Sequence, residues 1–129
     1  MVKRCLCETG KVLIFPCSGG SNCGQIANQA AIQLTEEGVG KIYCLAGIGA
    51  QENVMVDTTK AVDRVLAIDG CPIACAKRIL ENAGVIVTDY IDVSQTGIKK
   101  NQDFNLSLED ISSIVTKVKE MLGQTIITK

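Results

Sequence analysis

The sequence predicts an α/β protein in three layers (α/β/α), with helices on both faces of a mainly parallel, Rossmann-like sheet of about four strands. Short apolar runs rich in branched residues alternate along the chain with longer amphipathic segments, which is the pattern of βαβ units. Apolar residues make up 47% of the chain but aromatic residues only 3%, which suits a core of Val, Ile, Leu and Ala. A chain of 129 residues has the length of one domain, so we expect a single domain over 1–129.

The expected strands are continuous apolar runs, as in a sheet that is covered on both faces. They cover residues 11–16, 41–44, 65–68 and 85–93. Helices are expected where apolar residues recur at helical spacing between capping signals. They cover residues 23–37, 72–83 and 107–122. The segment 53–62 is rich in β-branched residues, but the alternation of strands and helices favours a short helix there. Residues 94–105 are expected to form a long polar loop, 1–10 an N-terminal arm or extra strand, and 123–129 a frayed tail.

Three cysteines stand at the ends of three successive expected strands. Cys17 follows the first strand, Cys44 ends the second and Cys71 follows the third, and both intervals are 27 residues. Because the carboxyl ends of parallel strands share one edge of the sheet, these cysteines are expected on one rim, where open α/β sheets bind ligands. Cys75 joins them from the third expected helix.

The turn Asp69-Gly70-Cys71-Pro72 is expected to open that helix. Cys71 would be the N-cap residue and Pro72 the first helical residue. Cys71 and Cys75, four positions apart, would then lie on one side of a helix N-terminus, where open N–H groups stabilise thiolates. For either cysteine alone, a small buried side chain in a tight turn would be the favoured interpretation, but the other cysteines expected at the same place favour a functional role for the pair. Asp69 is expected either to hydrogen-bond the turn or to orient ligands on the rim.

The composition narrows the classes of function. A formal net charge of −1, with acids and bases interspersed, predicts no nucleic-acid partner. No apolar run reaches the roughly 18 residues of a membrane span, and the N-terminus lacks the apolar stretch of a signal peptide, so we expect a cytoplasmic protein without a membrane partner. Seven cysteines are many for a reducing compartment and indicate metal or thiol chemistry. Histidine is absent, which removes the commonest general base and the imidazole ligand.

Two kinds of site fit the cysteines on the rim. The first is a four-thiolate metal site, with zinc as the expected ion and a Cys₄ iron–sulfur cluster as the second choice. Its ligands would be Cys17, Cys44, Cys71 and Cys75. The second is a thiol redox or sulfur-transfer protein that uses the same cysteines without a metal.

Cys23 stands in a loop that superficially resembles the phosphate loop of low-molecular-weight tyrosine phosphatases and arsenate reductases. The loop begins at Cys17, runs through a glycine-rich stretch and leads into a helix. Those enzymes need an arginine to hold the oxyanion, and Cys23 occupies its place, so phosphatase activity is disfavoured. Cys23 is instead a fifth candidate for the rim. Cys5 and Cys7 precede the first strand, at the opposite edge, and are secondary candidates.

Three motifs along the chain resemble those of the DGC-domain family, which takes its name from an Asp-Gly-Cys motif. In chain order they are Pro16-Cys-Ser-Gly19 with Gly24-Gln-Ile-Ala-Asn28, Tyr43-Cys-Leu-Ala-Gly47, and Ile68-Asp-Gly-Cys-Pro72 with Cys75. The resemblance spans roughly residues 12–90. It implies zinc bound by four cysteines, Cys17, Cys44, Cys71 and Cys75, which are the four that the rim argument selects. It names no reaction, and it leaves open whether the metal would be structural, catalytic or cargo.

Overall fold

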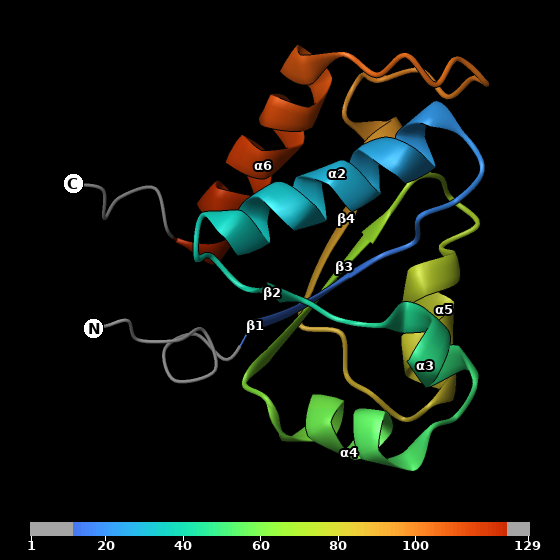
Figure 1. Cartoon of the computed structure of the whole chain (residues 1–129), viewed down its shortest axis with the longest axis vertical. Coiled ribbons are helices and arrows are strands. Elements are labelled where there is room, and N and C mark those ends of the chain that lie inside the picture. The colour runs from blue at the N-terminus through green and yellow to red at the C-terminus, as the bar shows by residue number, and fades with distance from the viewer. Residues whose placement is uncertain (1–11, 124–129) are drawn as a thin grey trace.

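The structure, a computed structural model, describes residues 12–123 (Figure 1). Its sheet contains four strands that all run parallel, in the order β2-β1-β3-β4. The strands are β1 (Val12–Pro16), β2 (Lys41–Ile42), β3 (Arg64–Asp69) and β4 (Asp89–Asp92). The expected fold class is confirmed. The arm 1–10 and the tail beyond residue 123 lie outside the described residues.

Helices cover both faces of the sheet, so the fold has three layers (Figure 1). On one face lie α2 (Asn22–Glu36) and α6 (Leu108–Leu122). On the other lie α3 (Leu45–Gly49), α4 (Asn53–Ala61) and α5 (Cys75–Asn82). Successive strand residues point to opposite faces. In β1, Ile14 therefore packs toward α2 and α6, while Phe15 packs toward the helices of the other face.

The chain changes direction at β1 and β3, which are neighbours in the middle of the sheet. The connection after β1 leads to α2 on one face, and the connection after β3 leads through a turn to α5 on the other. The two loops therefore diverge at the carboxyl ends of adjacent strands. This is the topological switch point at which open α/β sheets bind ligands.

One element matches the sequence-based expectation and several differ from it. Strand β2 covers only Lys41–Ile42 of the expected 41–44, and α5 begins at Cys75 instead of Pro72. The short helix expected near residues 53–62 is present as α4. Helix α3 was not expected, because Gly47 and Gly49 weaken helix propensity. A side chain at Gly47 would require the flexible end of Met55 to move aside. The fourth strand is shorter than expected: residues 85–88 have no regular secondary structure, and pairing with β3 covers only Asp89–Asp92.

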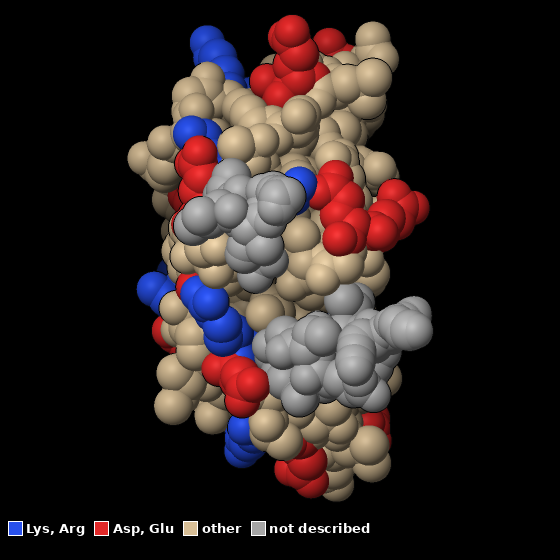
Figure 2. All heavy atoms as spheres, turned by 90° about the vertical axis from the view of Figure 1, so that its left-hand side faces the viewer, with Lys and Arg blue, Asp and Glu red and all other residues tan. Residues whose placement is uncertain are grey.

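The surface carries mixed charge. Figure 2 shows lysine and arginine interspersed with aspartate and glutamate over the face that it presents. Within residues 12–123, no helix combines the length and the apolar character that crossing a membrane requires.

An ion pair at the start of β3 is expected to make stability depend on acid. Arg64 donates from Nε and Nη2 to the two carboxylate oxygens of Asp89 (3.1 and 2.8 Å), and Thr88 Oγ1 donates to the same carboxylate (2.8 Å). Burial alone would raise the pKa of Asp89, but the hydrogen bonds from Arg64 and Thr88 outweigh it and hold the pKa below its ordinary value. A carboxyl whose pKa is lower in the folded state stabilises the protein above its unfolded pKa, and this contribution is lost as the pH falls through the folded pKa.

We therefore expect Arg64→Met to cost about 1–2 kcal/mol of unfolding free energy at pH 7, and the cost to shrink as the pH falls below about 4. Urea denaturation across a pH series measures both quantities. Lys119→Met, which breaks the more exposed pair with Glu37, is the matched control and should cost less than about 0.5 kcal/mol. Equal costs for the two variants, or a cost for Arg64→Met that does not change with pH, would contradict this assignment.

Candidate functional site

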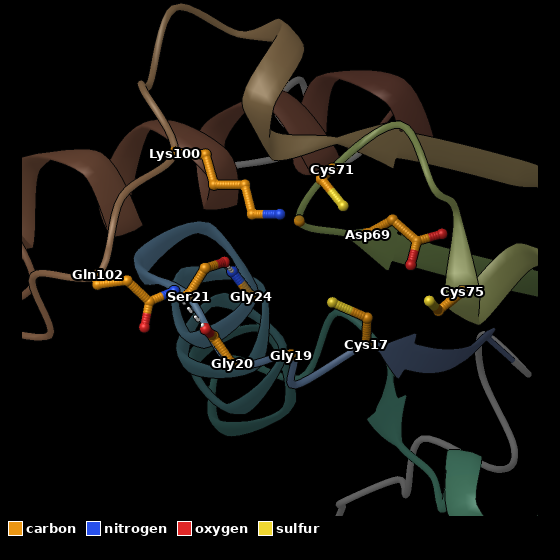
Figure 3. Close-up of a pocket in the computed structure, with 11 residues that line it drawn as sticks. Cys17, Gly19, Gly20, Ser21, Gly24, Asp69, Cys71, Cys75, Lys100 and Gln102 are labelled. Carbon is orange, nitrogen blue, oxygen red and sulfur yellow. Dashed lines mark hydrogen bonds between the residues drawn. The ribbon is translucent and has the colours of Figure 1, made fainter.

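The loops that follow β1 and β3 enclose a cavity of about 250 Å³ at the carboxyl edge of the sheet. Three of its lining residues are cysteines: Cys17 from the first loop, Cys71 from the second, and Cys75 from the first turn of α5. In Figure 3 the sulfur atoms of Cys17 and Cys71 face the same space. The structure thus brings together three of the four cysteines that the sequence selects.

Glycine contacts hold the two loops together. A Cβ atom at Gly70 would lie 2.6 Å from the backbone nitrogen of Gly24, and one at Gly24 would lie 2.5 Å from the carbonyl oxygen of Gly19. Distances this short to backbone atoms leave no room for a side chain. The glycine of the Asp-Gly-Cys motif is therefore needed for the β3 loop to lie against the start of α2, which brings Cys71 and Cys17 to one cavity.

Asp69 takes the capping role at the start of α5 that the sequence suggested for Cys71. Its carboxylate is buried and accepts hydrogen bonds from the N–H groups of Ala76 (2.8 Å) and Lys77 (3.1 Å), and from Tyr90 Oη (3.0 Å). It thus satisfies the open N–H groups of α5, which is the task of an N-cap residue. Of the two roles expected for Asp69, the structure shows hydrogen bonding, but the donors lie at the start of α5 and on β4 and not within the turn itself.

The expectation that Cys71 caps the helix is wrong. Helix α5 begins at Cys75, and Ala74 before it has a left-handed backbone (φ 59°) that ends the preceding turn. Cys71 and Pro72 lie in that turn, outside the helix. The helix-terminus argument for a stabilised thiolate therefore does not apply to Cys71. The open N–H groups of Ala76 and Lys77 are already hydrogen-bonded to the carboxylate of Asp69, six residues before the helix begins.

Two opposing effects act on the pKa of the Cys17 thiol, namely burial and hydrogen bonds from the backbone. Burial raises the pKa of the Cys17 thiol above its ordinary value, and the backbone N–H groups of Gly19 and Gly70 donate to its sulfur and oppose this shift. The nearby charge of Asp69, and that of Cys75 when it is ionised, act in the same direction as burial. The metal-free pocket therefore favours the neutral thiol at Cys17, and a cation at the sulfur would reverse this balance.

Cys44 lies in a neighbouring cavity. It is the N-cap residue of α3, where its sulfur accepts a hydrogen bond from the N–H of Gly47 (3.3 Å), and it is exposed. The second cavity, of about 430 Å³, is lined by Cys44 and also by Cys17. Cys17 therefore contributes to both cavities and stands between Cys44 and the pair Cys71 and Cys75. Within residues 12–123, no three Cys, Asp or Glu side chains are already arranged to hold a metal ion.

Cys23 does not line the cysteine cavity. Its side chain is fully buried in the core beside α6, and its thiol donates to the carbonyl oxygen of Ile98 (3.8 Å). Burial raises the pKa of this thiol. Cys5 and Cys7 lie outside the described residues.

Two residues of the long loop also line the cysteine cavity, and the sequence patterns did not reveal them. They are Lys100 and Gln102 (Figure 3). Asn22, at the start of α2, donates from Nδ2 to the carbonyl oxygen of Lys99 (2.8 Å) and accepts from the N–H of Asn101 (2.6 Å). The only local signal is the length of the loop, because the contacts that place it join residues nearly eighty positions apart.

The fold and the site together define the class: a parallel α/β protein with a cavity lined by cysteines at the switch point of its sheet. Comparison with known proteins makes this specific. The DGC-domain family model matches residues 13–118, so the chain belongs to the DGC-domain family. It is also 30% identical, over 110 residues, to the anaerobic and virulence modulator AnvM of Pseudomonas aeruginosa. That alignment covers 85% of this chain and 84% of the relative. No solved structure matches the chain.

Proposed function

We propose that this chain binds a zinc ion through cysteine thiolates at the carboxyl edge of its sheet. One observation supports the proposal above others: Cys17, Cys71 and Cys75, from two separate loops and a helix, line one cavity. Sulfur donors without histidine suit zinc, which accepts tetrahedral thiolate ligation and needs no redox partner. Family membership is in keeping with this chemistry.

The fourth ligand in this proposal is Cys44. It lines the cavity next to that of Cys71 and Cys75 and shares Cys17 with it. Asp69 is a poor alternative, because its carboxylate already accepts three hydrogen bonds. When bound, zinc would neutralise the thiolates and close the edge of the sheet, or act as a Lewis acid if one position stayed open. The protein's own part is to present the sulfurs, and the glycine contacts and the cap from Asp69 fix the two loops that carry Cys17, Cys71 and Cys75.

Removing the metal is expected to lower the melting temperature without unfolding the chain. Zinc that binds only the folded state adds RT ln(1 + [L]/Kd), about 4 kcal/mol when free metal is a thousand times Kd, or roughly 10–20 °C. Two apolar clusters, one on each face of the sheet, form a core that does not depend on the site. Metal analysis of the purified protein, with thermal melts before and after chelation, measures the effect. Because protons compete for thiolates, the difference should shrink as the pH falls.

One zinc per chain that is lost together with this stability would support the proposal. An unchanged melting temperature after zinc removal would contradict a site in the folded edge of the sheet. Complete unfolding on chelation would show that the two apolar clusters cannot hold the fold alone.

A thiol redox or sulfur-transfer protein is the second candidate. The observation in its favour is that the five described cysteines are free thiols, and Cys17 and Cys75 lie close enough for their charges to interact. The name of the relative describes an anaerobic modulator, and a redox-dependent role here would accord with that name. Absence of metal, together with a disulfide that forms reversibly between two cavity cysteines, would favour this candidate over zinc.

A further inference from the structure

The loop between η1 (Val93–Gln95) and α6 is fastened to the rim of the cysteine cavity on both sides of Lys100. On one side, Asn22 binds the carbonyl oxygen of Lys99 through its buried side chain. On the other, Asn22 exchanges two hydrogen bonds with the backbone of Asn101 (2.6 and 3.0 Å), and Gln102 Nε2 donates to the carbonyl oxygen of Gly20 (2.8 Å). These contacts fix the backbone from which the Lys100 side chain extends.

The side chain of Lys100 is directed into the cavity. Figure 3 shows its ammonium group pointing between Cys71 and the start of α2, into the space that the Cys17 sulfur also faces. In the described part of the chain, Lys100 is the only lysine or arginine among the lining residues. The wall next to it is small and uncharged, because it consists of Gly19, Gly20 and Ser21.

Asp69 also lines the cavity, but in the described part of the chain it forms no ion pair with Lys100. Its carboxylate oxygens instead accept hydrogen bonds from two N–H groups of α5 and from Tyr90. The cavity therefore combines one ammonium group with three thiols. Its volume of about 250 Å³ is more room than one metal ion needs.

We propose that this cavity binds a small carboxylate, with the carboxylate group at Lys100 and the other end of the molecule against the cysteine sulfurs. The inference goes beyond the zinc site and does not require a metal. It rests on the proposed function only in that both assign a role to the same cavity thiols. Lys100 is a binding residue here, and a guanidinium in its place should serve the same purpose.

The test compares two alkylating reagents of nearly the same size, iodoacetate, which carries a carboxylate, and iodoacetamide, which is neutral. Both transfer a two-carbon group to a thiolate sulfur and release iodide. The ratio of their rates therefore cancels the accessibility and the ionisation of each thiol. The full chain is reduced, treated with chelator and alkylated at low salt, and peptide mapping assigns the rate to each cysteine.

At Cys17 and Cys71 we expect the ratio of the iodoacetate rate to the iodoacetamide rate to exceed that of free cysteine by about fivefold. It should fall to the free-cysteine value in Lys100→Met and persist in Lys100→Arg. The control is Lys99→Met, which removes the same charge from a neighbouring residue that does not line the cavity and should leave the ratio unchanged. Propionate should slow alkylation by iodoacetamide in the wild type but not in Lys100→Met.

Equal ratios in the wild type and in Lys100→Met would overturn the inference, and so would equal losses in Lys100→Met and Lys99→Met. Because the assay is run without metal, its failure is distinct from failure of the zinc proposal. A chain that binds zinc but shows no preference for iodoacetate overturns only the carboxylate site. A chain that shows the preference but binds no zinc overturns only the metal site.

Discussion

Replacing Asp69 by alanine is expected to lower the free energy of unfolding by about 3–5 kcal/mol, a large part of the stability of a domain this size. The carboxylate is 1% exposed and accepts three hydrogen bonds, from the N–H groups of Ala76 and Lys77 and from Tyr90 Oη. Alanine would leave two N–H groups at the start of α5 and the hydroxyl of Tyr90 on β4 without this acceptor. Each unsatisfied buried donor costs about 1–3 kcal/mol, and partial access of water lowers the sum. Urea denaturation followed by circular dichroism measures the loss.

Two further variants separate this role from a general effect of charge. Tyr90→Phe removes only one of the three donors and should cost about 1 kcal/mol. Asp63→Ala removes an exposed carboxylate just before β3 and should cost less than about 0.5 kcal/mol. If Asp69→Ala were as stable as Asp63→Ala, the carboxylate would not be what holds the start of α5.

Asp69 also shows why the sequence predicts the fold better than the site. The strands were expected at short apolar runs, a signal that needs only a few neighbouring residues. The start of α5 is decided by a carboxylate six residues away that folds back across the turn. Cys71 and Pro72 look like a cap and a first helical residue, and this local signal is overridden by the contact from Asp69. The register of the cysteines depends only on where the strands end, so the cavity that Cys17 and Cys71 share could be anticipated.

Lys100 could not be anticipated in the same way. Nothing in the polar stretch 94–105 marks one lysine over its neighbour at position 99. Lys100 lines the cavity because Asn22, at the start of α2, hydrogen-bonds the backbone of Lys99 and Asn101 on either side of it. Contacts of this kind have no period and no local motif, so they become visible only when the fold brings the two segments together.

The zinc proposal predicts a graded series among the cysteine variants. Cys17→Ser, Cys71→Ser and Cys75→Ser each remove a thiolate from the shared cavity and should weaken zinc binding by more than about 100-fold, because even the loss of a residue that only supports a ligand costs 10–100-fold. Cys17→Ser should have the largest effect, since Cys17 also lines the cavity of Cys44. Cys44→Ser should also weaken binding, but less than Cys17→Ser, because Cys44 lines only the neighbouring cavity. Zinc competition with a coloured chelator measures each affinity.

The controls are the cysteines that the site does not use. Cys23→Ala should retain zinc, because Cys23 is buried beside α6 and does not line the cavity. Cys5 and Cys7 lie outside the described residues, and Cys5→Ser and Cys7→Ser should retain zinc as well. If zinc were lost only in the Cys5 and Cys7 variants, the metal would belong to the N-terminal segment. The cysteines at the switch point of the sheet would then be left to thiol chemistry without a metal.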